Sequence, residues 1–503
     1  MKKIILNNGD IMKKESIWLK DIKIVKNKPL NKDINVDVLI IGGGLTGIST
    51  LYNLRNEKLN ICLVEQNFIG SGVTSKSTAK INYLQETVYT DIYNKYDKET
   101  AKKYYDSQIF AINKIKEIIK KENIDCNLEQ AESYTFTNNK EEIRTIKNEK
   151  VLLEEFGAKV YEHTKIDLPL KSKYAISVKD TYVFHPIKYI QKLKEICEKH
   201  NLKIYEDTRI IEMTKCQDGY ICSTDTNKIT AKKVIIASHY PFFLKPYMFP
   251  LKVYNEKSYV TASKIQDYKN ETYITSKTPT KSIRYYKDKN NYIIYLSNSH
   301  SIDTNENYEN NFLKTIKEVH KLNLKPDYVW SNEDIMTVDK IPYIGYIEKN
   351  NNNLLIATGY NTWGMSNSVL ASFILKDLVL GNHNEFESLT NPKRVYNMNN
   401  IGNILSNIIG NAKSFICTKV NKNKSWYNKD IKFEVRDGKN IAIYNDGKKE
   451  YIVYSSCPHM GCTLLFNEFE KTWDCPCHAS RFNLDGRCIK GPSNYDISYK
   501  EKD

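Results

Sequence analysis

Short apolar runs alternate with amphipathic stretches in the first part of this chain of 503 residues. Residues 38–41 form an apolar run, a glycine-rich turn follows, and residues 48–55 continue with a helical pattern. A second apolar run begins after residue 60. This succession of strand, turn, helix and strand predicts the start of an α/β sheet whose strands are parallel.

The rest of this region predicts further helices and strands. Ile112, Ile115 and Ile119 share one helical face, which predicts an amphipathic helix at about 98–121. Between residues 252 and 300, Tyr and Ile alternate with polar residues, as in antiparallel strands. Other expected elements are a helix at 186–200, a helix ending near 381, and strands at 202–206, 233–238 and 354–357.

The pattern changes after Pro392, where an Asn-rich connector with a short amphipathic segment at 401–409 begins. From about residue 414 the chain has the pattern of an all-β unit. Asp-Gly pairs at 437–438 and 446–447 predict turns. They separate candidate strands at 431–435, 441–444 and 451–454.

The predicted fold class is therefore α/β plus all-β, in a chain long enough for several domains. A polar lead-in is expected first, then a large α/β domain, a linker and a small antiparallel-β domain. The expected boundaries are 1–35, 36–390, 391–413 and 414–503.

Composition excludes several classes of protein. With 41% hydrophobic and 27% charged residues, 20 Gly and 13 Pro, the chain is neither disordered nor collagen-like. No apolar run approaches the roughly 20 residues of a membrane span, and the start lacks the pattern of a secretory signal. We therefore expect a cytoplasmic protein without a membrane span.

The formal net charge is +15, from 75 basic and 60 acidic side chains. Such a charge would suit a nucleic-acid partner if it were concentrated on one face or helix. Here the excess is scattered Lys without a compact Arg-rich block. Modification of a nucleic acid stays open as an alternative function that the sequence does not favour.

Gly42, Gly44 and Gly47 form a G-x-G-x-x-G pattern between the first apolar run and its helix. The glycines would allow the tight turn, the approach of a pyrophosphate and the close packing of helix on strand. The helix N-terminus would face the phosphates. Glu65 ends the second strand, where a carboxylate can accept from ribose hydroxyls. The pattern predicts a dinucleotide site, with a purely structural glycine turn as the alternative.

Five of the 11 cysteines lie between residues 457 and 488. Two predicted loops there carry Cys457 with His459, and Cys475 with His478. Two thiolates and two imidazoles in this order fit a 2Fe-2S cluster in which the cysteines hold one iron and the histidines the other. A tetrahedral zinc site is the alternative, although zinc fingers usually pair Cys with Cys and His with His.

Three stretches, 70–80, 330–345 and 357–366, resemble the D-amino-acid-oxidase-like (DAO) family of FAD-dependent oxidoreductases, which includes glycine and sarcosine oxidases. The resemblance covers about residues 36–385. Beyond the glycine pattern and Glu65, it implies FAD contacts at Ser71, Thr74, Ser75, Thr78, Gly359, Gly364 and Met365.

The same resemblance implies a Rossmann-type FAD-binding domain joined to a β-rich substrate domain. The FAD-binding parts would be 36–90, 185–240 and 330–385, and the substrate parts 91–184 and 241–329. The stretch at 357–366 would open a helix whose positive N-terminal end stabilises negative charge on the reduced flavin.

The pattern of Cys and His closely resembles Rieske proteins. This resemblance implies a disulfide between Cys462 and Cys477, as in Rieske proteins of respiratory cytochrome bc complexes. Ser480 matches a serine that donates to a cluster sulfur in those proteins. Phe482 stands where they often carry a hydrogen-bonding Tyr, and we expect the loss of that donor to lower the reduction potential.

Together the resemblances imply an FAD- and 2Fe-2S-dependent oxidoreductase for a small amine or amino acid, acting on CH-NH or CH-NH2 donors. The substrate would give a hydride to the flavin, and the Rieske centre would relay single electrons to an external acceptor. Two alternatives stay open: reverse flow from the Rieske centre to the flavin, and a flavin oxidase whose metal domain is only a docking module.

The sequence gives weaker indications for the catalytic residues than for the cofactor sites. Members of the DAO-like family often bind a substrate carboxylate with an Arg above the flavin, which makes Arg284 a candidate, and His300 is a second one. A strand Arg is commonly a surface charge or ion-pair partner, and His300 and His185 have structural interpretations as well. Lys80 follows Thr78 and could lie near the flavin or in a polar loop.

Overall fold

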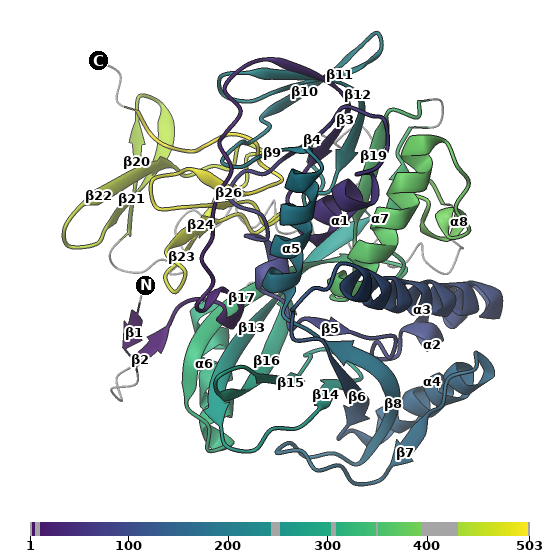
Figure 1. The fold of residues 1–503 in the computed structure, drawn as a ribbon. Helices are drawn as coiled ribbons and strands as arrows, with labels where there is room; N and C mark the ends of the chain where they lie inside the picture. Colours follow the sequence, from purple (N-terminus) through teal and green to yellow (C-terminus); the bar gives the residue numbers. More distant parts are fainter. Residues whose placement is uncertain are drawn as a thin grey trace.

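The computed structural model describes residues 3–5, 11–242, 252–302, 308–348, 351–394 and 431–500. Figure 1 shows a large body of helices and sheets with a smaller β unit, coloured yellow-green, against one side. An α/β body followed by a small all-β unit confirms the predicted fold class. The expected amphipathic segment at 401–409 and most of the expected linker lie outside the described residues.

Parallel strands form the centre of the sheet that carries the glycine turn. β3 (Ile34–Ile41) lies between β4 (Ile61–Val64) and β12 (Lys228–Ile236), and all three run parallel. Residues 38–41 of β3 are all buried, as expected for a strand covered on both faces. The sheet is completed by β9 (Lys203–Tyr205), β10 (Glu212–Cys216), β11 (Gly219–Ser223), β18 (Tyr343–Tyr346) and β19 (Leu354–Thr358).

Helices α1 (Leu45–Asn53), α5 (Pro186–Lys199) and α7 (Gly364–Leu380) pack beside this sheet (Figure 1). α1 contacts both α5 and α7, and Thr46 Oγ1 on α1 donates to Ser368 Oγ on α7 at 3.0 Å. These three helices confirm the predicted helical patterns. The remaining helices are α2 (Val88–Lys95), α3 (Lys98–Lys121), α4 (Ile143–Glu155), α6 (Tyr308–Lys321) and α8 (Glu387–Thr390).

A second, larger sheet lies below the first in Figure 1. Its longest strands are β13 (Val253–Ile265), β16 (Asn291–Ser301) and β17 (Pro326–Thr337), and β13 pairs antiparallel with the other two. This confirms the expected antiparallel strands. The other strands are β1 (Lys3–Ile5), β2 (Ile11–Lys13), β5 (Lys80–Ile81), β6 (Glu129–Thr137), β7 (Tyr161–His163), β8 (Tyr174–Val183), β14 (Glu271–Thr275) and β15 (Ser282–Lys287).

The segment expected to be a polar lead-in is built into the large body. β2 pairs with β17 at Lys13 and Tyr328. Trp18 is fully buried, and its Nε1 donates to the Ser77 carbonyl oxygen at 2.7 Å. A single tryptophan in a Lys-rich stretch has no periodicity, so the sequence pattern does not reveal this anchor.

The small β unit confirms the three predicted strands as β20 (Ile431–Arg436), β21 (Lys439–Asn445) and β22 (Glu450–Tyr454). A separate sheet contains β23 (Leu465–Asn467), β24 (Thr472–Asp474), β25 (Arg481–Phe482) and β26 (Cys488–Lys490). Trp473, Phe482 and Leu464 are fully buried and form its core together with several cysteines.

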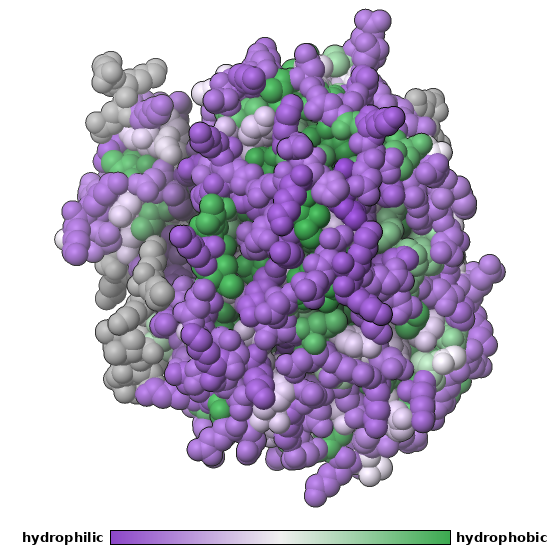
Figure 2. Space-filling model, viewed as in Figure 1, coloured by the Kyte–Doolittle hydropathy of each residue, from purple (hydrophilic) through white to green (hydrophobic). Residues whose placement is uncertain are grey.

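Polar side chains cover most of the face shown in Figure 2, with apolar residues in scattered patches. Within the described ranges, no helix has the length and apolar character needed to cross a membrane.

Candidate functional site

The glycine pattern forms a tight turn between β3 and α1. Gly42 has φ +114°, and a Cβ there would lie 2.6 Å from the Ala237 carbonyl oxygen. A Cβ on Gly47 would lie 1.9 Å from the Gly42 carbonyl oxygen. Both positions therefore require glycine, the first for its conformation and the second for helix-on-strand packing.

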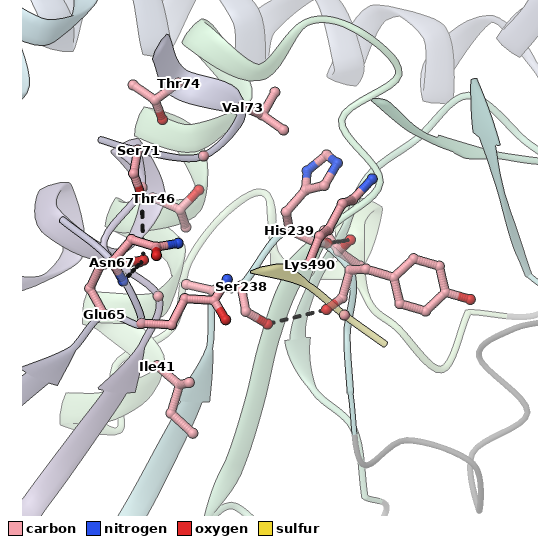
Figure 3. Close-up of a pocket in the computed structure, with 18 of the residues that line it drawn as sticks. Ile41, Thr46, Glu65, Asn67, Ser71, Val73, Thr74, Ser238, His239 and Lys490 are labelled. Atoms are coloured by element: carbon pink, nitrogen blue, oxygen red, sulfur yellow. Dashed lines mark hydrogen bonds between the residues drawn. The ribbon is translucent and has the colours of Figure 1, made fainter. Parts of the chain in front are cut away.

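A cavity of about 540 Å³ lies in front of this turn. Figure 3 shows that its wall combines the ends of several strands with the loop after β4. A Cβ on Gly44 would meet Thr74 Oγ1 first, at 3.5 Å, so the backbone at the N-terminus of α1 is open to a ligand. Backbone N–H groups and the helix dipole suit the pyrophosphate of a dinucleotide.

Glu65 holds the turn and faces the cavity. Its Oε2 accepts from the Gly43 N–H at 2.7 Å and its Oε1 from the Asn67 N–H at 2.9 Å. Burial raises the pKa of Glu65, whereas these two backbone donors lower it. A carboxylate has more acceptor sites than these two bonds use, so it can also accept from a ribose hydroxyl.

Most of the FAD contacts predicted from the sequence meet at this cavity. Gly47 lies behind it under α1, and Ser75 donates to the Gly72 carbonyl oxygen at 3.0 Å instead of lining it. Thr78 lines a second cavity. The predicted residues that line the large cavity are Gly42, Gly44, Glu65, Ser71, Thr74, Gly359, Gly364 and Met365.

His239, which was not predicted from the sequence, follows the end of β12 and lines the same cavity. Its Nε2 is buried and has no hydrogen-bond partner. Burial and the nearby Lys490 lower the pKa of His239 to about 3, so the ring is neutral at physiological pH. The available signal was its position at the carboxyl end of a parallel strand, where α/β sheets bind ligands.

The small β unit supplies part of the wall of the large cavity. Figure 3 shows Lys490 of the small unit close to His239 of the large one. The large cavity is therefore shared between the two parts of the chain. The residues contributed by the small unit are Arg481, Ile489, Lys490, Gly491, Ser493 and Asn494.

A buried network of charges joins the two parts beside this cavity. Lys257 on β13 contacts Glu470 at 2.6 Å, Glu333 at 3.3 Å and Asp474 at 3.7 Å. Its side chain is 1% exposed. Burial lowers the pKa of Lys257, but Glu470 and its other acidic neighbours raise it overall.

Two further cations, Arg481 and Lys490, belong to this charge network. Arg481 contacts Glu470 at 2.7 Å and Asp474 at 3.0 Å, and Lys490 pairs with Glu333. Burial alone would raise the pKa of Glu333, but Lys490, Lys257 and Arg481 hold it well below its usual range. The buried Lys76 also acts on Glu470 and Glu333, so four cations surround the three carboxylates of this network.

A second cavity of about 50 Å³ adjoins the first, and Gly364 and Met365 line both. It lies against the β13–β17 ladder and is lined by Thr78 and Lys80 as well. Lys80 Nζ donates to the Ser282 hydroxyl at 2.6 Å and the Tyr273 carbonyl oxygen at 3.0 Å. Burial, helped by Arg284, lowers the pKa of Lys80 to about 7.

Neither predicted catalytic residue lines either of these two cavities. Arg284 is 1% exposed, and its guanidinium donates to the carbonyl oxygens of Thr78, Ala79 and Phe184 at 2.7 to 2.9 Å. These contacts give Arg284 a structural role and do not support the predicted binding of a substrate carboxylate. The surface charge considered as its alternative is excluded by its burial.

His300 also lies away from both cavities. Its Nε2 lies 3.0 Å from the Tyr259 hydroxyl, and its ring stacks on Tyr259 and Tyr308. His185, the weaker candidate, caps α5 by accepting from the Lys188 N–H at 3.2 Å. Both histidines have the structural roles that the sequence left open.

The four predicted metal ligands come from two loops of the small unit. The thiols of Cys457 and Cys475 lie within hydrogen-bonding reach of each other. The rings of His459 and His478 lie edge to face with their centroids 5.0 Å apart. Two cysteines and two histidines are thus paired as a histidine-ligated 2Fe-2S cluster requires.

Hydrogen-bond donors surround the two candidate cysteine ligands. Cys457 Sγ receives the N–H groups of His459 and Met460, and Cys475 Sγ those of Cys477 and His478. Such donors stabilise thiolates, so the donor set fits cysteines that ligate iron.

Ser480 and the disulfide reinforce these loops. Ser480 forms a hydrogen bond with the Cys457 thiol, and its Oγ also accepts from the Ser493 N–H at 2.9 Å. Cys462 and Cys477 are joined with an S–S distance of 2.03 Å, which confirms the predicted disulfide. The Cys475 thiol lies within 4.8 Å of both disulfide sulfurs.

Comparisons with known proteins agree with both sites. Residues 37–378 match the FAD dependent oxidoreductase family (DAO), and residues 418–499 match the Rieske [2Fe-2S] domain family. Over 495 residues the chain is 29% identical to the putative Rieske 2Fe-2S iron-sulfur protein YhfW of Bacillus subtilis, which spans 95% of this chain and 96% of that protein.

Two other similarities cover the large body. The chain is 20% identical over 382 residues to the gamma-glutamylputrescine oxidoreductase of Escherichia coli, spanning 72% of this chain and 88% of that protein. The solved glycine oxidase from Geobacillus kaustophilus superposes with a TM-score of 0.62 at 16% identity, covering 72% of this chain and 100% of that chain. At this identity the structural likeness establishes the fold alone.

Proposed function

The chain belongs to the FAD dependent oxidoreductase family and ends in a Rieske [2Fe-2S] domain, and from this premise we propose that it oxidises a small amine or amino acid and relays the electrons through the Rieske domain to an external acceptor. FAD and a Rieske-type 2Fe-2S cluster are its cofactors. When bound, FAD takes a hydride from a carbon next to nitrogen, and the cluster carries one electron at a time.

The observation that carries this proposal is the shared wall of the large cavity. Residues of the glycine turn between β3 and α1 and residues of the Rieske domain line the same cavity. Gly44 and the N-terminus of α1 would hold the FAD pyrophosphate, and Glu65 a ribose. A domain that served only for docking a partner would have no need to reach into the cofactor cavity.

Residues of the Rieske domain close this cavity on one side. Lys490 is held by Glu333, and the Gln66 side chain donates to the Ile489 carbonyl oxygen at 3.1 Å. Arg209 contacts Asp496 at 2.6 Å on the same side. These contacts fix the Rieske domain against the FAD-binding part.

The substrate side of the proposal is supported by the second cavity. It shares Gly364 and Met365 with the cofactor cavity, so a small molecule bound there lies next to the cofactor. The similarity to the gamma-glutamylputrescine oxidoreductase of Escherichia coli supports a CH-NH or CH-NH2 donor.

The two candidate histidine ligands differ in exposure. His478 is 8% exposed, whereas His459 is partly exposed and follows the exposed Pro458. We therefore assign the exit of electrons to the His459 side of the Rieske domain. The acceptor is a one-electron carrier that approaches this side.

Anaerobic mixing of the full-length holoprotein with a panel of amines and amino acids tests this function. A substrate should bleach the flavin absorbance and then produce the rhombic EPR signal of a reduced, histidine-ligated 2Fe-2S centre, without any added acceptor. Cys457→Ser should abolish the EPR signal and retain the bleaching, whereas Cys216→Ser, outside the Rieske domain, should retain both.

Two results would overturn the relay. One zinc ion per chain with no EPR signal would make the C-terminal domain a docking module of a flavin oxidase. If no amine or amino acid reduces the flavin, but electrons supplied to the Rieske cluster do, electrons flow in the reverse direction, from the cluster to the flavin.

A further inference from the structure

The second cavity is built on one face of the ladder between β13 and β17. Glu256 lies directly opposite Asp334, and Ser258 lies directly opposite Asn332. Alternate residues of a strand point to the same face, so these four side chains share one face, and all four line the cavity. The two carboxylates would repel each other, and like charges directly opposite destabilise a sheet.

Two buried polar atoms of this wall that can accept hydrogen bonds, Asn332 Oδ1 and Ser258 Oγ, have no partner. Asn332 Nδ2 donates to Asp334 Oδ2 at 2.7 Å, which fixes the orientation of the amide. Asn332 Oδ1 is buried without a hydrogen-bond partner, and its residue is 4% exposed. Ser258 Oγ is also buried without a hydrogen-bond partner, and its residue is 5% exposed. Buried acceptors without partners cost free energy unless a ligand supplies donors.

The charge of the cavity wall is negative among the described residues. Burial raises the pKa of Glu256, and burial with the repulsion from Glu256 raises the pKa of Asp334 to about 7. Of the residues that the structure describes, Lys80 is the one basic side chain in the wall, and its ammonium is already directed to Ser282 and Tyr273. A bound cation would relieve the repulsion between the carboxylates.

Other titratable groups act on this wall from neighbouring elements. Lys490 lowers and Glu333 raises the pKa of Asp334. Glu86 acts on Glu256 as a like charge, and the hydroxyl of Thr280, a wall residue, donates to Glu86 Oε1 at 3.4 Å. Lys340 attracts Glu86 and Glu256 but is not part of the wall. Within the described ranges no arginine lines this cavity. Arg284 donates instead to three carbonyl oxygens.

We propose that this cavity binds the ammonium group of the substrate through Asn332, Asp334 and Glu256, so that the substrate class is a small cationic amine recognised without a carboxylate. An ammonium has three donors and no acceptor, which complements the two carboxylates and the unpartnered Asn332 Oδ1 of the wall. The volume of about 50 Å³ holds only about four water-sized groups, so the recognised head is compact. The proposal rests on the proposed function and assigns its substrate class.

Binding of matched small ions to the full-length oxidised holoprotein tests the site directly. The probes are n-propylamine, which is a cation at pH 8, and propionate, an anion of similar size. Titration calorimetry should show binding of propylammonium and at least tenfold weaker binding of propionate. A shift of the flavin absorbance on titration reports whether the probe occupies the cavity next to the cofactor.

Variants of the wall separate recognition from folding. Asp334→Asn keeps the shape and removes the charge, and it should weaken propylammonium binding at least tenfold while leaving propionate unaffected or favoured. Glu256→Gln is the second wall variant, with the same expectation. The control is Asp327→Asn, which lies on the same strand outside the wall and should bind both probes as the parent does.

Several outcomes would overturn the assignment. Propionate binding more tightly than propylammonium, or unchanged affinity in both wall variants, would show that the wall does not select a cation. Calcium binding that propylammonium does not displace would make the wall a metal site. Propylammonium binding that depends on Asp334, without reduction of the flavin by any amine, would uphold this site and reject the proposed function.

Discussion

Gly47 shows how one residue type determines the cofactor site. Its Cβ position lies 1.9 Å from the Gly42 carbonyl oxygen, inside the turn that faces the cavity. The Gly42 carbonyl belongs to the backbone and cannot move aside as a flexible side chain can. A Cβ at position 47 would therefore push α1 away from β3. The free energy of folding and the shape of the cofactor cavity therefore depend on the same contact.

We expect Gly47→Ala to destabilise the protein by about 1–3 kcal/mol, as overpacking does, and to lower its FAD content. Thermal unfolding and flavin absorbance per chain measure the two effects. Asn56→Ala, at an exposed position just after α1 and outside the cavity wall, is the control. A Gly47→Ala protein with full flavin content and unchanged unfolding would contradict this account.

Ser480 acts on the other cofactor through one hydroxyl group. Its hydrogen bond to the Cys457 thiol confirms the donor that the Rieske resemblance implied. A donor to a ligating sulfur stabilises the more negative, reduced state of a cluster. Phe482 lies two residues further along the chain and is fully buried, and its side chain has no hydroxyl that could act as a second donor.

We expect Ser480→Ala to lower the midpoint potential of the Rieske centre by about 60 mV, the one-electron equivalent of about 1.4 kcal/mol. Phe482→Tyr should shift it upward. A redox titration followed by EPR measures both shifts, and the exposed Ser498→Ala variant should leave the potential unchanged. An unaltered potential in Ser480→Ala would reject the role of this hydroxyl.

At the scale of elements, the β13–β17 ladder serves two sites with its two faces. Lys257 and Glu333 are directly opposite each other and belong to the charge network at the Rieske domain. Their neighbours on either side along the strands line the small cavity instead. The period of two along a strand thus separates the domain contact from the proposed substrate wall by one residue.

The wall of the small cavity should titrate near neutral pH. Asp334, whose pKa is about 7, ionises as the pH rises from 6 to 8, and Lys80, whose pKa is also about 7, loses its charge over the same range. Both changes favour a bound cation. We expect propylammonium to bind about tenfold more tightly at pH 8 than at pH 6, as a single group with a pKa of 7 would give.

In the absence of ligand, the two groups change the stability in opposite directions between pH 6 and 8. The lowered pKa of Lys80 makes stability rise with pH, whereas the raised pKa of Asp334 makes it fall. A carboxyl group whose pKa is raised by folding contributes stability that is present below its unfolded pKa and is lost as the pH passes its folded pKa. Because propylammonium binds more tightly at pH 8, it should raise the unfolding temperature more at pH 8 than at pH 6. The effect should vanish in Asp334→Asn, and equal stabilisation at both pH values would count against an ionising wall.

At the scale of the whole molecule, the buried charge network holds the Rieske domain against the FAD-binding part. Removing one partner of a buried ion pair leaves an uncompensated charge, which costs about 3–5 kcal/mol. Lys257 is the cation that the large body supplies to three carboxylates, two of them in the Rieske domain.

We expect Lys257→Met to weaken the domain contact by about 3 kcal/mol without disturbing the Rieske loops. Calorimetry should show the Rieske domain unfolding in a separate transition. Substrate-dependent bleaching should stay, whereas the EPR signal should appear at least tenfold more slowly. Lys264→Met, exposed on the same strand, is the control, and a single transition with normal kinetics in Lys257→Met would contradict the role of the network.

Local patterns in the sequence were sufficient for the cofactor sites. The glycine turn depends on three residues within six positions, and the cluster loops on two Cys and His pairs, so neighbours along the chain carry the information. The long helix at 98–121 and the strands of the Rieske domain follow from periodicity for the same reason.

Tertiary structure alone decided the sites built from distant segments. Arg284 has the residue type of a carboxylate ligand, but the fold surrounds it with carbonyl oxygens. His239 and Lys490 are separated by 251 positions and meet only because the Rieske domain docks at the end of β12. Long-range contacts depend on the packing of whole sheets and domains, which no local pattern encodes, so the sequence determined the cofactors and the fold determined what surrounds them.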